Sequence, residues 1–89
     1  MVAAAIGLAE AVLNITYDGE QGELPDPVLY DASDADIIRW ATEAVRGGIP
    51  GITARADANL AGYVVQRFGS TADLPNRVVC RPKTEYGGR

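Results

Sequence analysis

The stretch DASDADIIRWATEAVRGGIP, residues 31–50, constrains the fold most, because it carries both a start and a stop signal for one helix. Ser33 or Asp34 offers a side-chain oxygen that accepts a hydrogen bond from an otherwise free backbone N–H of the first turn. Gly47-Gly48 provides a left-handed C-cap, and Pro50 prevents the helix from continuing. The sequence therefore predicts a helix of about three to four turns between these signals.

The apolar residues of this helix recur at a spacing that places them on one side. They stand at i, i+1, i+4, i+7 and i+8, at Ile37, Ile38, Ala41, Ala44 and Val45. Such a stripe is stable only against an apolar partner surface. The segments on both sides of the helix are rich in β-branched and aromatic residues, so we expect that surface to be a sheet.

Two strands are predicted before the helix. Residues 12–17 alternate apolar and polar side chains, which is typical of a strand with one buried face. Asp18-Gly19 follows as a turn signal, and Gly22 indicates a mobile loop. A short second strand is expected at residues 28–30, where the two preceding prolines favour an edge position or an irregular start.

After the helix, residues 49–57 are expected to form a loop, and two interpretations compete for residues 57–68. Apolar residues recur there at helical spacing, but a helix would contain Gly62 and several poor helix formers in a row. We favour a strand over Tyr63–Phe68 for that reason. A last strand is predicted at residues 76–81, and residues 82–89 are expected to be a mobile polar tail.

Strand, strand, helix, strand and final strand is the order of the β-grasp fold, an α+β architecture. We expect a mixed four- to five-stranded sheet packed on one main helix, with the first and last strands side by side and parallel in the middle. The domain would span residues 12–82, with an N-terminal extension at residues 1–11 and a flexible C-terminal tail at residues 83–89.

Composition and charge exclude several classes of function. The net charge of −4 argues against nucleic-acid binding, which needs clustered Lys and Arg. The chain has no histidine, so the commonest general base and metal ligand is missing, and we expect no catalytic residues, no metal site and no cofactor. Its single cysteine, Cys80, excludes an internal disulfide, suits a reducing cytoplasm and is expected to be a buried small hydrophobe.

The apolar N-terminus, MVAAAIGLAEAV, predicts neither secretion nor a membrane anchor. It lacks a basic n-region and a convincing cleavage site, and Glu10 interrupts it. It is also too short to span a bilayer. We therefore expect a cytoplasmic protein that does not bind membranes.

Several short motifs, taken in order, resemble ubiquitin and the ubiquitin-like modifiers. Ala32-Ser33-Asp34 opens the helix and Gly48-Ile49-Pro50 closes it, as in ubiquitin. Both chains then have an intervening strand, a loop with a leucine, a basic last strand and a diglycine. These later features are Leu74, Arg77, Arg81 and Gly87-Gly88, so the resemblance covers roughly residues 12–88.

The resemblance implies that the chain acts through a C-terminal glycine carboxylate. Because Arg89 follows Gly88, it implies a precursor that is trimmed after Gly88 by a JAMM-type metallopeptidase. An adenylating enzyme would then activate the carboxylate, and a conjugating enzyme would join it to target proteins by an isopeptide bond. Glycines suit this role because they have no Cβ to obstruct a narrow enzyme channel. Lys83, the only lysine, is a possible acceptor for chains of the modifier.

Two alternatives belong to other classes. A sulfur carrier, also a β-grasp protein with a diglycine end, would form a thiocarboxylate on Gly88. A non-conjugated interaction or structural domain would have a C-terminus, Gly87-Gly88-Arg89, that is simply a flexible end. An adduct on a protein amine, a thiocarboxylate, or an unchanged tail distinguishes the three.

Overall fold

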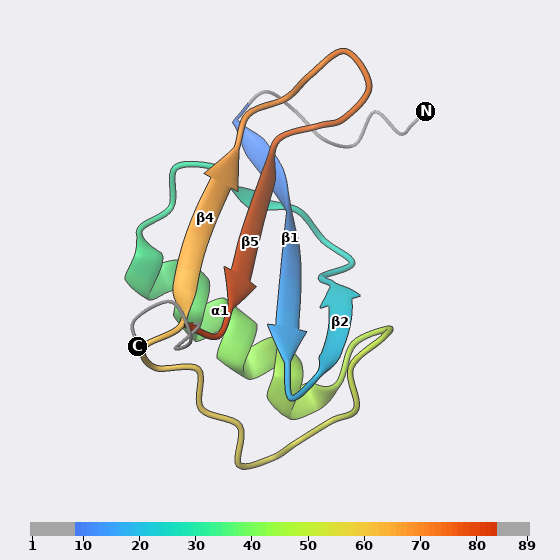
Figure 1. Cartoon of the computed structure of the whole chain (residues 1–89), viewed down its shortest axis with the longest axis vertical. Helices are drawn as coiled ribbons and strands as arrows, with labels where there is room; N and C mark the ends of the chain where they lie inside the picture. The colour runs from blue at the N-terminus through green and yellow to red at the C-terminus, as the bar shows by residue number, and fades with distance from the viewer. Residues whose placement is uncertain (1–8, 84–89) are drawn as a thin grey trace, which may run out of the picture.

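One helix lies across one face of a mixed sheet in the computed structural model, which describes residues 9–83 (Figure 1). The described elements, in chain order, are β1 (Glu10–Tyr17), β2 (Glu20–Glu23), β3 (Val28–Leu29), α1 (Asp34–Gly47), β4 (Val64–Phe68) and β5 (Arg77–Arg81). The expected α+β class, with a mixed sheet of up to five strands and one main helix, is confirmed for this part of the chain.

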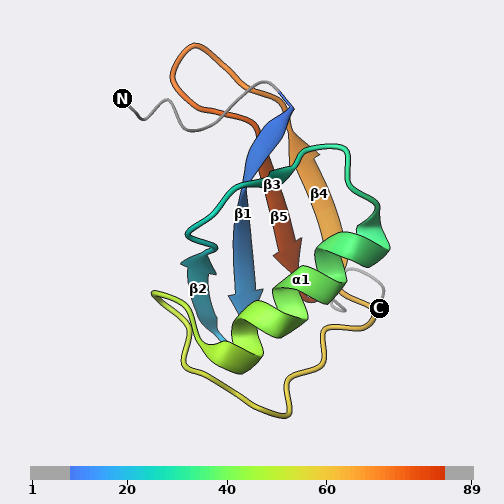
Figure 2. The same cartoon turned by 180° about the vertical axis from the view of Figure 1, so that it is seen from behind.

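The sheet is organised around two parallel strands, β1 and β5, as the sequence predicts. The strand order is β2-β1-β5-β4, and β3 pairs with the start of β1. All pairs except β1–β5 are antiparallel. The chain crosses from the β1 side of the sheet to β4 through α1, which lies behind the sheet in Figure 1 and in front of it in Figure 2.

The caps of α1 are the ones that the sequence signals predict. Ser33 is the N-cap, because its Oγ accepts a hydrogen bond of 3.1 Å from the backbone N–H of Asp36. Gly48 is the C-cap, with φ of 84°, and its N–H donates to the carbonyls of Ala44 and Val45. These local contacts fix both ends of the helix within the sequence that forms it.

The core lies between α1 and the sheet. One side chain from each successive turn of the helix is fully buried, and alternate residues of the two central strands are buried opposite them. These residues are Ile37, Ala41 and Val45 of α1, Ala11, Leu13 and Ile15 of β1, and Val78 and Cys80 of β5. The predicted helix stripe and the predicted β5 set therefore meet, and this contact holds the sheet and the helix together.

The structure corrects the prediction of a mobile loop at Gly22, because residues 20–23 form β2. Asp18 and Gly19 both have positive φ, at 53° and 81°, as a two-residue type I′ turn requires, so the chain reverses directly into a hairpin. Gly22 is buried, and a Cβ added to it would lie 2.4 Å from the carbonyl oxygen of Pro50. A glycine is needed there because the loop after α1 packs against β2 at close range.

Other boundaries differ by one or two residues. β1 begins at Glu10, because β3 pairs with Glu10 and Ala11 and extends the strand before the expected start at Val12. The expected second strand corresponds to β3 and is shortened to Val28–Leu29, and β5 begins at Arg77. The competition at residues 57–68 is decided for the strand, since β4 occupies Val64–Phe68.

Candidate recognition surface

The predicted processing residues lie outside the described residues. Gly87, Gly88 and Arg89 follow the last described residue, Lys83, which is exposed just beyond the end of β5. The possible chain acceptor is thus at the surface, as an acceptor amine requires. β5, the strand that ends shortly before Lys83, contributes to the side of the sheet that α1 leaves uncovered, and this side is the candidate site.

This uncovered side, here called the outer face, is made by the strand residues that alternate with the core. Arg77, Val79 and Arg81 of β5 alternate with buried Val78 and Cys80. The registers place Val12 and Asn14 of β1 on one side of them and Val64, Gln66 and Phe68 of β4 on the other. Over β4, β5 and the adjoining part of β1, the outer face therefore consists of Val12, Asn14, Val64, Gln66, Phe68, Arg77, Val79 and Arg81. The same alternation places Glu10 and Thr16 of β1 and Gln21 and Glu23 of β2 on this side.

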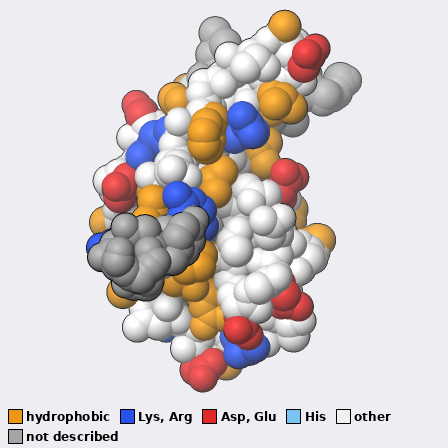
Figure 3. Space-filling model, viewed as in Figure 1, with side chains coloured by type: hydrophobic (Ala, Val, Ile, Leu, Met, Phe, Trp, Pro, Cys, Tyr) orange, Lys and Arg blue, Asp and Glu red, His pale blue; other side chains and the backbone are white. Residues whose placement is uncertain are grey.

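Two cross-strand pairs organise the outer face. The guanidinium carbon of Arg77 lies 5.0 Å from the ring centroid of Phe68, within cation–π range. Arg81 donates from Nε to Oε1 of Gln66 at 3.0 Å. Val79 lies between the two arginines along β5. Figure 3 shows the result, with apolar and basic side chains together over β4 and β5.

β5 contributes two positive charges to the outer face, at Arg77 and Arg81. Within residues 9–83, Arg39 pairs with Asp36, Arg55 with Asp18 and Arg67 with Asp34, and these ion pairs do not involve Arg77 or Arg81. Nε of Arg77 is also buried without a hydrogen-bond partner within that range. The two guanidinium groups and the apolar side chains beside them can contact a partner segment that carries carboxylates and apolar groups.

Cys80 lies on the opposite, helix-covered face of the same strand. It is fully buried, and burial raises the pKa of its thiol to about 11. The thiol therefore stays protonated at neutral pH, whereas a nucleophilic cysteine acts as the thiolate. Its packing among the core residues confirms the expected role as a small buried hydrophobe.

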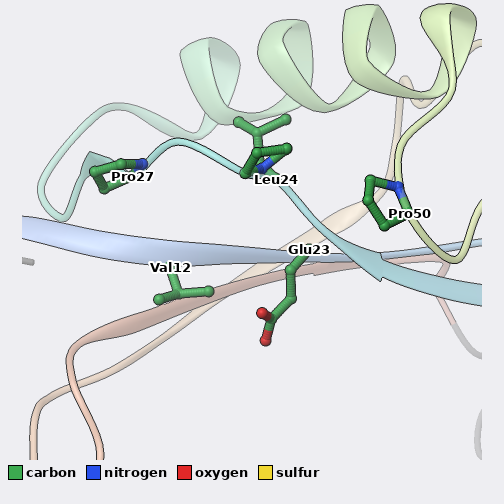
Figure 4. Close-up of a pocket in the computed structure, with 6 residues that line it drawn as sticks. Val12, Glu23, Leu24, Pro27 and Pro50 are labelled. Atoms are coloured by element: carbon green, nitrogen blue, oxygen red, sulfur yellow. The ribbon is translucent and has the colours of Figure 1, made fainter. Parts of the chain in front are cut away.

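A hollow of about 460 Å³ opens beside β1, where the chain between β2 and β3 passes it (Figure 4). Its lining consists of Val12, Glu23, Leu24, Pro25, Pro27 and Pro50. It offers apolar surface and one carboxylate, so no acid and base pair faces a substrate there. Within residues 9–83, no three His, Cys, Asp or Glu side chains gather in a way that could hold a metal ion.

Comparison of the chain with protein-family models, with curated proteins and with solved structures finds no match. In the described part of the chain, α1 is not long and apolar enough to cross a membrane.

Sequence reasoning identified Arg77 and Arg81 through the resemblance to ubiquitin, but it did not identify Phe68 and Gln66 as their partners. Apolar residues recur at helical spacing over residues 57–68, so the sequence did not show which residues of β4 point to the outer face. The alternation of β5 was the available signal, since it indicates that Arg77 lies on the outer face. A residue directly opposite Arg77 in an antiparallel pair, which is Phe68, must lie on the same face.

Proposed function

We propose that the chain is a ubiquitin-like protein modifier with a β-grasp fold. It would be cleaved after Gly88 and then joined through the carboxylate of Gly88 to amines of target proteins. The observation that carries this proposal is the position of β5. It is a central strand, parallel to β1, and it leaves the sheet at Arg81 with residues 82–86 between it and the diglycine.

The arrangement of strands and helix supports the β-grasp part of the proposal. A β1–β2 hairpin precedes α1, the helix covers one face of the sheet, and the chain returns through β4 to a central β5. This order gives a stable body that presents the chain after β5 at one end of the sheet. Gly87-Gly88 follow β5 by a few residues in the sequence. Because they have no side chains, they suit an enzyme channel that is wide enough only for backbone.

The proposed chemistry has four steps. A JAMM-type metallopeptidase hydrolyses the Gly88–Arg89 peptide bond, and water supplies the oxygen of the new carboxylate. An adenylating enzyme joins this carboxylate to the α-phosphate of ATP, and pyrophosphate leaves. A cysteine thiolate of the enzyme displaces AMP and forms a thioester. Finally, a conjugating enzyme directs the Nζ of a target lysine to the thioester carbonyl, and an isopeptide bond replaces the thioester as the thiolate leaves.

The outer face supplies the recognition that these steps require. The chain itself offers Arg77, Arg81 and the apolar side chains between them on the strand that leads to the diglycine. An acidic and apolar surface on the activating enzyme would bind them and hold the exit of β5 in a fixed position. Orientation of this kind converts the capture of the Gly88 carboxylate into an intramolecular event.

The test uses chains with defined ends, mixed with candidate adenylating enzymes and ATP. A chain that ends at Gly88 should support ATP–pyrophosphate exchange, whereas the full chain with Arg89 and a chain that ends at Gly87 should not. Co-expression of the full chain with a candidate metallopeptidase should remove Arg89, as seen by intact-mass spectrometry. A thiocarboxylate on Gly88 without protein adducts would favour a sulfur carrier. Biological activity that survives deletion of residues 87–89 would overturn both.

Lys83 is proposed as the acceptor for chains of the modifier because it is exposed and lies beyond the sheet. The matched variant is Lys83→Arg, which keeps the charge and removes the nucleophilic amine. It should form single conjugates on targets and lose the higher species that contain two copies. Persistence of those species in the variant would show that the acceptor amine lies elsewhere.

A further inference from the structure

The two edge strands of the described sheet, β2 and β4, differ in what packs against their backbones, and β4 is the more open one. Val12 N–H donates to the carbonyl of Asn76 at 3.0 Å, so Asn76, Val78 and Cys80 direct their backbone groups toward β1. The alternate residues of β5 therefore direct theirs toward β4. The register then makes Val65 and Arg67 the residues of β4 whose N–H and C=O groups face away from the sheet.

No described strand other than β5 pairs with β4. The backbone of β4 makes no hydrogen bond there to any described segment other than β5. An edge strand with free N–H and C=O groups is a template for another strand, and proteins usually protect such edges with charges, prolines or covering loops.

The opposite edge has this protection. β2 has glutamates at both ends, Glu20 and Glu23, and the loop at Pro50 and Gly51 packs against its backbone. Proline residues also interrupt the passage from β2 to β3. The β4 sequence, Val-Val-Gln-Arg-Phe, contains neither an acid nor a proline, and β-branched and aromatic residues favour pairing. The asymmetry shows which edge is available.

The charge of Arg67 does not protect the β4 edge from pairing, because its side chain is bound to other residues of its own chain. Its Nε donates to the carbonyl of Tyr30 at 3.1 Å, and its Nη1 lies 2.8 Å from Oδ1 of Asp34. The guanidinium is thus held over the N-terminus of α1, and its charge is paired. A strand that approaches β4 does not meet a free cation.

We propose that β4 pairs antiparallel with β4 of a second copy of this chain, in a register centred on Gln66, so that two sheets join into one. In this register Val65 of each copy lies opposite Arg67 of the other, and each of these pairs can exchange both of its backbone hydrogen bonds. The outward groups of the edge are then satisfied, and a two-fold axis passes between the two Gln66 residues.

The side chains of β4 fit this register. On the outer face, Phe68 of each copy lies opposite Val64 of the other, which covers a phenyl ring that is 40% exposed in the single chain. Gln66 lies opposite Gln66, and amide side chains can donate to and accept from each other. Arg67 meets the neutral Val65, so no like charges are brought together. This self-complementarity identifies a second copy as the occupant of the edge.

The first measurement is analytical ultracentrifugation of the full chain over a range of concentrations. The chain should pass from monomer to dimer as concentration rises, and amide hydrogen exchange of Val65 and Arg67 should slow in parallel. A monomer at every concentration up to the solubility limit would overturn the proposal, as would a dimer in which these two amides exchange as in the monomer.

Two charge variants then test the register. Gln66→Glu keeps an acceptor for Arg81 but places like charges opposite each other at the axis, so the dimer dissociation constant should rise by roughly fivefold. Gln66→Lys should also weaken the dimer, and an equimolar mixture of the two variants should recover it. The matched control is Gln21→Glu on the exposed outer face of β2, which changes the net charge equally. Equal weakening by the control, or no recovery in the mixture, would overturn the proposal.

Discussion

The two faces of the sheet are built by the same strands, yet they do different work. On β5, Val78 and Cys80 are fully buried under α1, whereas Arg77, Val79 and Arg81 lie on the outer face between them. Each core position of this strand is adjacent in sequence to a position on the outer face. The pleat of the strand therefore separates the residues that stabilise the core from those proposed to bind a partner, and we expect each set to be alterable with little effect on the other.

The largest expected effect is on the covered face, and adjacent residues of β1 provide the comparison. Leu13 is fully buried, so Leu13→Ala leaves a cavity and should lower the free energy of unfolding by about 2–5 kcal/mol. Val12, on the outer face, is half-buried, and Val12→Ala should cost about 1 kcal/mol or less. Urea denaturation of both variants measures the difference. Similar losses would mean that the outer face is also packed as a core.

The second-largest expected effect on stability is at Gly51, in the loop after α1 that packs against β2. Gly51 has φ of 95°, and a Cβ added to it would lie 2.1 Å from the carbonyl oxygen of Gln21. Gly51→Ala therefore combines an unfavourable backbone conformation with a steric overlap and should cost about 3 kcal/mol. Gly62→Ala is the control, because φ there is 84° but nothing lies within 4 Å. It should cost about 1 kcal/mol, and denaturation that ranks the two equally would contradict the close packing of this loop on β2.

The sequence could predict the parts of the fold that depend on local contacts, but not β2, which depends on this loop. The caps of α1 are local, so Ser33 and Gly48 could be recognised from their neighbours alone. β2 could not be predicted, because Glu-Gln-Gly-Glu has no apolar alternation and the strand depends on its pairing with β1 and on the loop at Pro50. Here tertiary contacts override local preference.

The candidate surface was predictable only in part, for a related reason. A basic last strand is visible in the sequence, but the face on which each arginine lies depends on the register of β5 with β1 and β4. Phe68 could be assigned to this surface only from the register of β4 with β5, which places it opposite Arg77. The diglycine was predicted from resemblance, and it lies outside the described residues, so its role stays a prediction.

Alkaline pH should lower the stability of the fold through Cys80, which lies on the covered face of the sheet. Burial raises the pKa of this thiol from its ordinary value of 9.0 to about 11, so the folded chain holds the proton more tightly than the unfolded chain does. Its contribution to stability is present below pH 9 and is lost as the pH rises toward 11. Burial also raises the pKa of Tyr63, with a smaller effect from Tyr17, and this adds a loss in the same direction.

Cys80→Ala removes the thiol and keeps the Tyr63 phenol. It also removes the charge of the Cys80 thiolate, which is one of the smaller causes of the raised pKa of Tyr63, so both contributions to the alkaline loss decrease. The variant should be less stable at neutral pH, since it removes a buried group, but its stability should fall less steeply between pH 9 and pH 11. Urea denaturation across this range measures both slopes. Equal slopes would mean that the thiol is open to water in the folded chain, and it would then react with a disulfide reagent at the rate of an unfolded cysteine.

The smallest expected effect lies on the outer face, between Phe68 and Arg77. Their cation–π contact is partly exposed, so a double-mutant cycle with Phe68→Leu and Arg77→Gln should give a coupling energy of about 0.5–1 kcal/mol. Each single variant should remain folded, because neither side chain contributes to the buried core. If Arg77 is a docking residue, Arg77→Gln should weaken the binding of an acidic activating enzyme far more than it weakens the fold. A variant that loses stability and binding in equal measure would show that the two faces are not independent.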